Sequence, residues 1–264
     1  MDISNIAVLL QSWESFGHGA ATPWWVLVLH IVGVLVGLLF LFMVARGIAR
    51  HRRYRAVNAL DAAALQAIHE EIRAAERRTV GEIVPVVLER SDAHPQAGAI
   101  AALLAMLIGS GALAADLPWD HPPLLLLCQL GFGAIGFLAA RSLPDFRRSF
   151  VSEARATEMA FEQAFQEFYK LGLHRTEEQT GVLIFVSLFE RRVVVLGDEG
   201  IDAKIDAKSW EGVDDAILTG LRADSLSDGL CAGIRGAADI LAEHFPWTEG
   251  DRNELPDRVV VRRE

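Results

Sequence analysis

The sequence predicts an α/β fold, in which a small mixed β-sheet sandwiched by helices is interrupted by a transmembrane helical hairpin and preceded by an N-terminal transmembrane helix. Three observations predict it. First, the 264 residues combine 52% hydrophobic residues with a net charge of -10. Second, the apolar and charged residues are segregated, because residues 24–45 and 97–140 carry almost no charge and most acids follow residue 152. Third, the polar part alternates β-branched runs with helical stripes of apolar residues.

The first apolar segment covers residues 24–46 and follows an N-terminal segment, 1–23, that we expect outside the cytoplasm. Its run from Trp24 to Ala45 has the length of roughly 20 apolar residues that a bilayer-spanning helix requires. A signal peptide is a poor interpretation, since no Lys or Arg precedes the run and the basic cluster follows it.

Two further apolar segments, 97–115 and 123–141, predict a transmembrane hairpin. The linker between them reads DLPWDHP and is long enough only for a turn. Small residues let two helices approach closely in a bilayer. The residues expected to do so are Gly109, Gly111, Gly131, Gly133 and Gly136.

The arginines predict the orientation of these segments. The segment before the first run and the hairpin linker contain no Lys or Arg, whereas eight arginines lie just after the first and third runs. Because positive residues stay cytoplasmic, we expect a multi-pass protein of a bacterial-type inner (plasma) membrane, with its N-terminus outside and its main domain cytoplasmic. The basic juxtamembrane linker 47–60 should contact anionic lipid. The arginines are Arg46, Arg50, Arg52, Arg53, Arg55, Arg141, Arg147 and Arg148.

Segments 61–96 and 147–245 should form one polar domain. Its first part predicts a helix over 61–78, capped by Asp61, and then a strand from Gly81 to Leu88. Pro85 lacks an N–H donor, so it should lie at an edge or a bulge of that strand.

After the hairpin we expect a helix over 152–171, with Phe161, Phe165 and Phe168 on one face. Residues 181–197 then predict a β-hairpin whose first arm is a central strand covered on both faces. Two amphipathic helices follow, the second beginning at a capping box of Ser225 and Asp228. The polar tail 246–264 remains unassigned.

These elements resemble a known family. The stretch IHEEIRAAERRTVGEIVPVVL, then HRTEEQTGVLIFVSLFERRVVVLGDEGID, then two amphipathic helices is similar to the TPM domain. The resemblance implies a small sheet between helices and, for some members, phosphatase activity or divalent-ion binding. A transmembrane hairpin after the first strand is a departure from the simple family pattern.

The acidic loop after the β-hairpin is the candidate metal site. Its carboxylates come from Asp198, Glu199, Asp202 and Asp206, and oxygen ligands at short spacing suit Ca²⁺ or Mg²⁺. Gly197 would let the backbone wrap around an ion. The alternative is a solvated loop in which these acids form turns and helix caps.

A second, weaker candidate is a phosphate site at Arg175 and Thr176, since an arginine beside a hydroxyl can hold a phosphate. The sequence contains no P-loop, no G-x-S-x-G, no H-E-x-x-H and no C-x-x-C. No catalytic residue is therefore assigned from a motif. The acidic balance argues against nucleic-acid binding, which needs cationic residues to displace counterions from phosphates.

Two functions follow as hypotheses. The first is an accessory module of the inner membrane, whose cytoplasmic domain binds a divalent ion or a partner, either another membrane protein or a second copy of the chain. The second is a metal-assisted phosphatase, in which an ion held by residues 198–206 polarises the phosphoryl oxygen and generates hydroxide.

Overall fold

The computed structural model describes residues 38, 42, 60–112 and 121–262. The predicted N-terminal helix over 24–46 and its flanking segments 1–23 and 47–60 lie almost wholly outside the described residues. The described chain divides into two compact units. One contains residues 98–112 and 121–139, and the other contains residues 60–97 together with 140–262.

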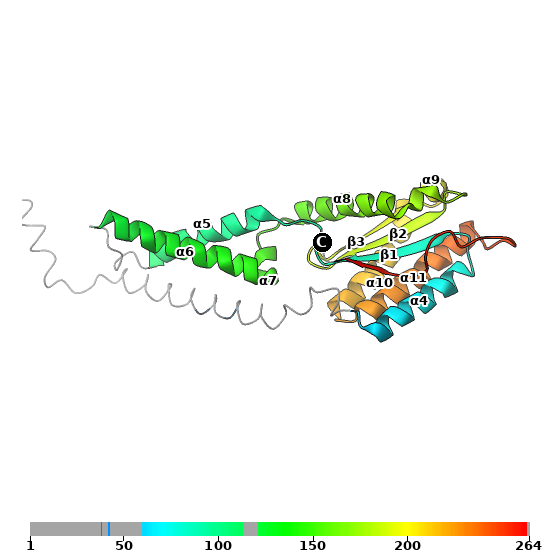
Figure 1. Ribbon diagram of the computed structural model, residues 1–264, viewed down its shortest axis with the longest axis horizontal. Helices are drawn as coiled ribbons and strands as arrows, with labels where there is room; N and C mark the ends of the chain where they lie inside the picture. The colour runs from blue at the N-terminus through cyan, green and yellow to red at the C-terminus, as the bar shows by residue number, and fades with distance from the viewer. Residues whose placement is uncertain (1–37, 39–41, 43–59, 113–120, 263–264) are drawn as a thin grey trace, which may run out of the picture. The chain divides into compact units, whose positions relative to one another are not determined.

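The second unit is built on the predicted mixed sheet, which has four strands in the order β3-β2-β1-β4 (Figure 1). Strand β1 pairs parallel with β2 and with β4, whereas β2 pairs antiparallel with β3. Strand β2 is buried at every residue, as expected of a central strand covered on both faces. The strands are β1 Glu82–Leu88, β2 Gly181–Ser187, β3 Arg192–Gly197 and β4 Val260–Arg262.

Helices cover both faces of this sheet (Figure 1). Helix α8, Glu153–Leu171, lies on one face, and α4 (Ala62–Glu76), α10 (Glu211–Arg222) and α11 (Leu226–His244) lie on the other. The alternation along the strands explains the two cores: Ile83 and Val87 face α4, α10 and α11, while Val84 and Val86 face α8. Short helical turns connect the layers, namely α7 Pro144–Arg148, η2 Leu173–Arg175, α9 Glu199–Asp202 and η3 Ala207–Trp210.

Two local predictions for the first strand and helix are confirmed. The Asp61 carboxylate caps α4 by accepting a hydrogen bond from the Ala64 N–H at 2.8 Å. Strand β4 pairs only with residues 86–88 of β1, so Pro85 lies in the half of β1 that has a single partner strand. A missing N–H donor therefore costs no ladder bond on the β4 side.

The predicted helix over 152–171 forms as α8, but of its three phenylalanines only Phe168 is buried against the sheet. Phe161 and Phe165 are 51% and 49% exposed, because α8 packs on the sheet through Phe168 and the smaller side chains Ala160 and Ala164. The predicted capping box at the start of α11 does not form. No side chain caps the backbone there, and the Ser225 hydroxyl donates instead to the Asp228 carboxylate.

The first unit contains two apolar helices, α5 (Pro95–Ala112, which begins in the other unit) and α6 (Pro122–Ser142). They approach closely at Gly136, where an added Cβ would lie 2.4 Å from the Ala101 carbonyl oxygen. Gly109 and Gly133 are also at contacts, whereas Gly111 and Gly131 have open space. Within the described ranges, α6 alone is long and apolar enough to cross a membrane, and α5 is a shorter apolar helix.

Candidate functional site

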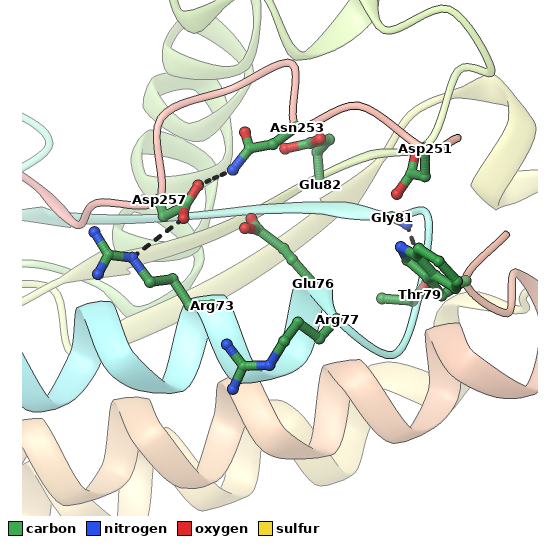
Figure 2. Close-up of a pocket in the computed structure, with 10 residues that line it drawn as sticks. Arg73, Glu76, Arg77, Thr79, Gly81, Glu82, Asp251, Asn253 and Asp257 are labelled. Carbon is green, nitrogen blue, oxygen red and sulfur yellow. Dashed lines mark hydrogen bonds and ion pairs between the residues drawn. The ribbon is translucent and has the colours of Figure 1, made fainter. Parts of the chain in front are cut away.

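A polar pocket of about 320 Å³ lies where the end of α4, the start of β1 and the C-terminal segment 247–257 meet (Figure 2). Its walls carry four carboxylates and two guanidinium groups. The lining residues are Arg73, Glu76, Arg77, Thr79, Gly81, Glu82, Trp247, Asp251, Asn253 and Asp257.

Hydrogen bonds near Thr79 hold the start of the C-terminal segment against the pocket. The Thr79 hydroxyl, 1% exposed, donates to the Phe245 carbonyl oxygen at 2.6 Å, and the Val80 N–H donates to the same oxygen at 3.1 Å. The Trp247 N–H donates to the Arg78 carbonyl at 3.2 Å. These bonds satisfy backbone groups just after α4 ends and direct the chain across the start of β1.

Two carboxylates hold the far end of the segment. One Glu82 oxygen, Oε1, accepts a hydrogen bond from the Glu254 N–H at 2.9 Å. The Arg73 guanidinium pairs with Asp257 at 3.4 Å (Figure 2). Glu82 is therefore both part of the pocket wall and an anchor of the segment that encloses it.

The second oxygen of Glu82 has no hydrogen-bond partner, although the residue is only 5% exposed. Burial raises the pKa of Glu82 to about 6. Backbone hydrogen bonds offset part of this shift, and the charges of Asp251 and Glu254 add smaller increases. An ionised carboxylate with an unpaired oxygen in such a place is costly, so the site favours an incoming positive charge.

Glu76 is perturbed further in the same direction. Burial raises its pKa to about 9, and the negative charges of Glu82 and Asp257 add to the shift. Its Oε2 atom is buried and has no hydrogen-bond partner. At neutral pH Glu76 is protonated, and it can release that proton when a cation approaches.

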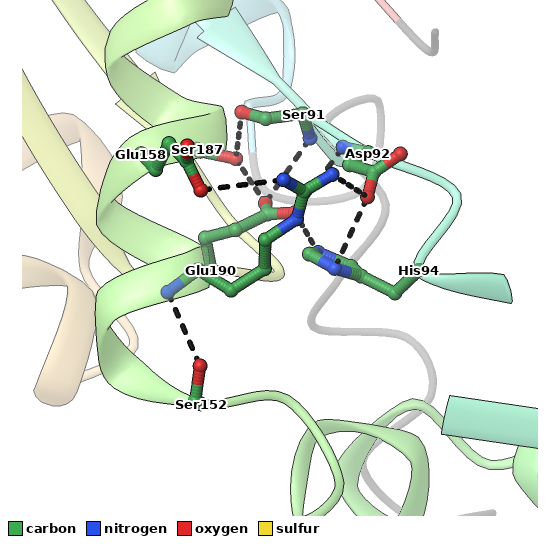
Figure 3. Close-up of polar contacts among 8 residues, drawn as sticks. Ser91, Asp92, His94, Ser152, Glu158, Ser187 and Glu190 are labelled. Carbon is green, nitrogen blue, oxygen red and sulfur yellow. Dashed lines mark hydrogen bonds and ion pairs between the residues drawn. The ribbon is translucent and has the colours of Figure 1, made fainter. Parts of the chain in front are cut away.

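A second polar cluster, which sequence reasoning missed, lies at the other end of β1 and β2 (Figure 3). The Glu190 carboxylate is 1% exposed and receives the Ser187 hydroxyl, the Ser91 N–H at 3.1 Å, the Asp92 N–H at 3.4 Å and His94 Nε2 at 2.7 Å. Burial alone would raise the pKa of Glu190, but hydrogen bonds from His94, Ser187 and Ser91 hold it below its usual value. The sequence feature that could have indicated this cluster is Ser-Asp-x-His, which closely follows a buried strand.

The cluster has no free carboxylate oxygen at its centre. His94 is fully buried, and its Nδ1 faces Asp92 at 3.4 Å, which in turn lies 3.6 Å from Arg155. The Ser187 hydroxyl is itself buried and receives the Ser91 hydroxyl at 2.9 Å. A serine so enclosed cannot attack a substrate, so this cluster fastens the loop after β1 to the β2–β3 turn.

A family model described as TPM domain matches residues 145–240. The chain contains a TPM domain. The matched range runs from α7 through most of α11, and thus includes β2, β3 and the acidic loop. The pocket residues, which lie at 73–82 and 247–257, are outside this range.

A solved structure is also similar to this chain. It is the NMR structure of the BA42 protein from the psychrophilic bacterium Bizionia argentinensis, with 22% identity and a TM-score of 0.49, covering 77% of this chain and 95% of that one. No curated protein matches the chain.

In the TPM domain the acidic loop is more structured than its polar sequence indicates. Asp198, 7% exposed, caps α9 by accepting the Glu199 N–H at 2.9 Å, and its Oδ2 has no hydrogen-bond partner. Burial and the neighbouring Asp198 charge raise the pKa of Asp202. Asp206 caps η3 by accepting the Lys208 N–H at 2.9 Å, and Glu199 is exposed.

The loop thus brings Asp198 close enough to Asp202 for their charges to interact, while two of its acids serve as helix caps. Across the ranges 60–112 and 121–262, no group of three or more His, Cys, Asp or Glu residues is arranged to hold a metal ion. The metal site at residues 198–206 stays a prediction.

The predicted phosphate residues lie at the turn before β2. Thr176 is 5% exposed, and its hydroxyl accepts the Thr180 N–H at 3.0 Å. Arg175 is exposed and donates from Nε to His174 Nε2 at 3.4 Å. The threonine hydroxyl is engaged in shaping the turn, and phosphate binding here also stays a prediction.

Proposed function

We propose that this chain is a membrane-anchored binding module, whose α/β unit lies on the cytoplasmic side of an inner membrane and binds a cation in the polar pocket. The observation that carries the binding function is Glu82. Its carboxylate is almost fully buried and lines a pocket of about 320 Å³, and one of its oxygens has no partner.

Three further acids support a cationic ligand. Glu76, Asp251 and Asp257 share the pocket with Glu82, against two arginines, one of which already pairs with Asp257. A bound cation would replace the solvation that Glu82 has lost and would remove the repulsion between it and its acidic neighbours.

Calorimetric titration of the full chain in lipid nanodiscs tests this function. The ligands are CaCl₂, MgCl₂ and an organic ammonium salt, each added at constant ionic strength. We expect at least one of them to bind, and Glu82→Gln to abolish the binding while leaving the thermal unfolding midpoint within a few degrees. Binding that is unchanged in Glu82→Gln would contradict the proposal.

The membrane attachment is supported by α6, a helix of 21 residues that is long and apolar enough to cross a membrane. Arg141, Arg147 and Arg148 follow its apolar run, and positive residues remain cytoplasmic. Glu199→Cys places a thiol at an exposed position of the TPM domain. A membrane-impermeant maleimide should label it only after cell lysis, and labelling of intact cells would place the domain on the opposite side.

A second candidate function is the metal-assisted phosphatase, favoured by the unpartnered, buried Oδ2 of Asp198 beside Asp202. A divalent ion there would polarise a phosphoryl oxygen and lower the pKa of its bound water. Release of phosphate from p-nitrophenyl phosphate, dependent on Mg²⁺ or Ca²⁺ and lost in an Asp198→Asn, Asp202→Asn double variant, would support it. No turnover with any divalent ion would leave the binding module as the function.

A further inference from the structure

The size and lining of the pocket say more about its ligand than its charge does. We infer that the pocket takes an organic ammonium ion, whose cationic head contacts Glu82 and whose carbon skeleton packs on Trp247. This inference rests on the proposed function, because it names the ligand class of the same site.

The first argument is volume. Pockets for small organic ligands begin at about 300 Å³, and this one measures about 320 Å³. A single metal ion with its first water shell would leave much of that space to solvent. A primary ammonium group of a molecule with several carbon atoms fills the carboxylate region and extends along the wall.

The second argument is the exposed aromatic surface. Trp247 lines the pocket, yet it remains 49% exposed while its backbone is fixed to Arg78. A tryptophan is the most favourable aromatic partner for a cation and also covers an apolar skeleton. The pocket therefore combines a buried anionic end with an apolar wall, which is the arrangement that an alkylammonium or arylalkylammonium ion requires.

The third argument is proton balance. The ammonium head brings a positive charge to Glu82 and Glu76, which favours their ionised forms. Glu76 holds a proton at neutral pH, so binding should release protons into the buffer. The groups that face these two carboxyls from α4, β1 and the C-terminal segment are Arg73, Arg77, Asp251, Glu254 and Asp257.

Benzylammonium chloride is the probe, and benzyl alcohol, its uncharged analogue, is the matched control. Titration calorimetry of the full chain in nanodiscs at pH 7.5, repeated in phosphate and HEPES buffers, neither of which is a net cation at this pH, measures both affinity and the number of protons released. We expect benzylammonium to bind with proton release and benzyl alcohol to give no heat. Trp247→Ala should weaken benzylammonium about fivefold, the size of an exposed cation–aromatic contact, without changing proton release.

Glu243→Gln supplies the matched variant, since Glu243 is an exposed acid of α11 outside the pocket lining, and it should bind like the wild type. If Ca²⁺ or Mg²⁺ binds in a Glu82-dependent way and benzylammonium does not, the ligand class is wrong while the proposed function stands. If no cation binds, both fail. Equal affinity of wild type and Trp247→Ala for benzylammonium would also overturn the role of the tryptophan.

Discussion

Two buried glutamates at opposite ends of the parallel strands β1 and β2 show how differently the same side chain can be used. Glu190 receives four hydrogen-bond donors, and its pKa lies below the usual value. Glu82 receives the Glu254 N–H on one oxygen, leaves the other without a partner, and has a pKa of about 6. The two residues are almost equally buried, at 1% and 5% exposure.

The difference teaches that hydrogen-bond satisfaction, and not burial, separates a structural carboxylate from one available to a ligand. A fully bonded buried carboxylate stabilises the fold and is costly to remove. A partly bonded one raises the free energy of the unliganded protein, and a ligand can recover that cost. The following substitutions test this contrast, in order from the largest expected effect to the smallest.

The largest effect is expected from Glu190→Ala. It leaves the Ser187 hydroxyl, two backbone N–H groups and His94 without their common acceptor, which should lower the free energy of unfolding by about 3–5 kcal/mol. Thermal unfolding followed by circular dichroism measures it. Glu158→Ala is the control, because Glu158 is 58% exposed and pairs only at the surface with Arg155, so its loss should cost at most about 1 kcal/mol. Similar losses for both variants would contradict the structural role of Glu190.

Glu76→Gln should act in the opposite direction. The folded-state pKa of Glu76 is about 9 against 4.5 in the unfolded chain, so the folded protein binds the extra proton between these values. Stability should therefore fall as pH rises from about 4.5 to 9 and stay level above. The variant should flatten that slope and be more stable than wild type at pH 8 by about 1–3 kcal/mol, after screening by solvent. Identical unfolding curves at pH 5 and pH 8 for wild type would refute this.

The stability contribution of Glu190 should depend on pH in the opposite direction. Its folded-state pKa is lowered, so its contribution is present above the unfolded value and is lost as pH falls through the folded value, below about 4.5. Comparing acid unfolding of wild type with Glu190→Gln isolates this contribution. An unchanged acid midpoint would mean that the network does not depend on the charge of Glu190.

Ser91→Ala should have a smaller effect, because it removes one member of the network and leaves Glu190 bonded. The change deletes the 2.9 Å hydrogen bond to the Ser187 hydroxyl but keeps the backbone N–H that donates to Glu190. We expect a loss of about 1 kcal/mol in urea unfolding, the net value of one hydrogen bond. A loss as large as that of Glu190→Ala would show that the cluster acts as one indivisible unit.

The sheet and its main helices were predictable because they depend on local patterns. The β-branched arms of residues 181–197 form β2 and β3, and the apolar stripes of residues 211–244 form α10 and α11. The large aromatic residues of α8 did not indicate which of its side chains contact the sheet. Contact with the sheet at Ala160 and Ala164 requires small side chains there, which leaves Phe161 and Phe165 on the outside.

The pocket could not be predicted, because its parts are distant in sequence. Glu76 and Glu82 come from the start of the domain, whereas Trp247 and Asp257 come from the tail, which showed no periodic pattern. The pairing of β4 with β1 and long-range contacts such as the hydrogen bond between Thr79 and Phe245 bring the tail to that place. The acidic loop was predicted as a metal site because its carboxylates are close in sequence, although such acids often form helix caps.

The smallest effect on stability is expected at the acidic loop. Asp198 has one carboxylate oxygen that accepts a hydrogen bond, as in Glu190, and one without a partner, as in Glu82. Its Oδ1 caps α9, while its buried Oδ2 has no partner. Asp198→Asn keeps an oxygen for the cap, so stability should change by less than about 0.5 kcal/mol, Asn and Asp being equivalent helix caps. The substitution removes the charge beside Asp202, and the pKa of Asp202 should fall toward its usual value. Carboxyl NMR titration measures that fall, and an unchanged pKa would mean that the two side chains do not interact and cannot share an ion.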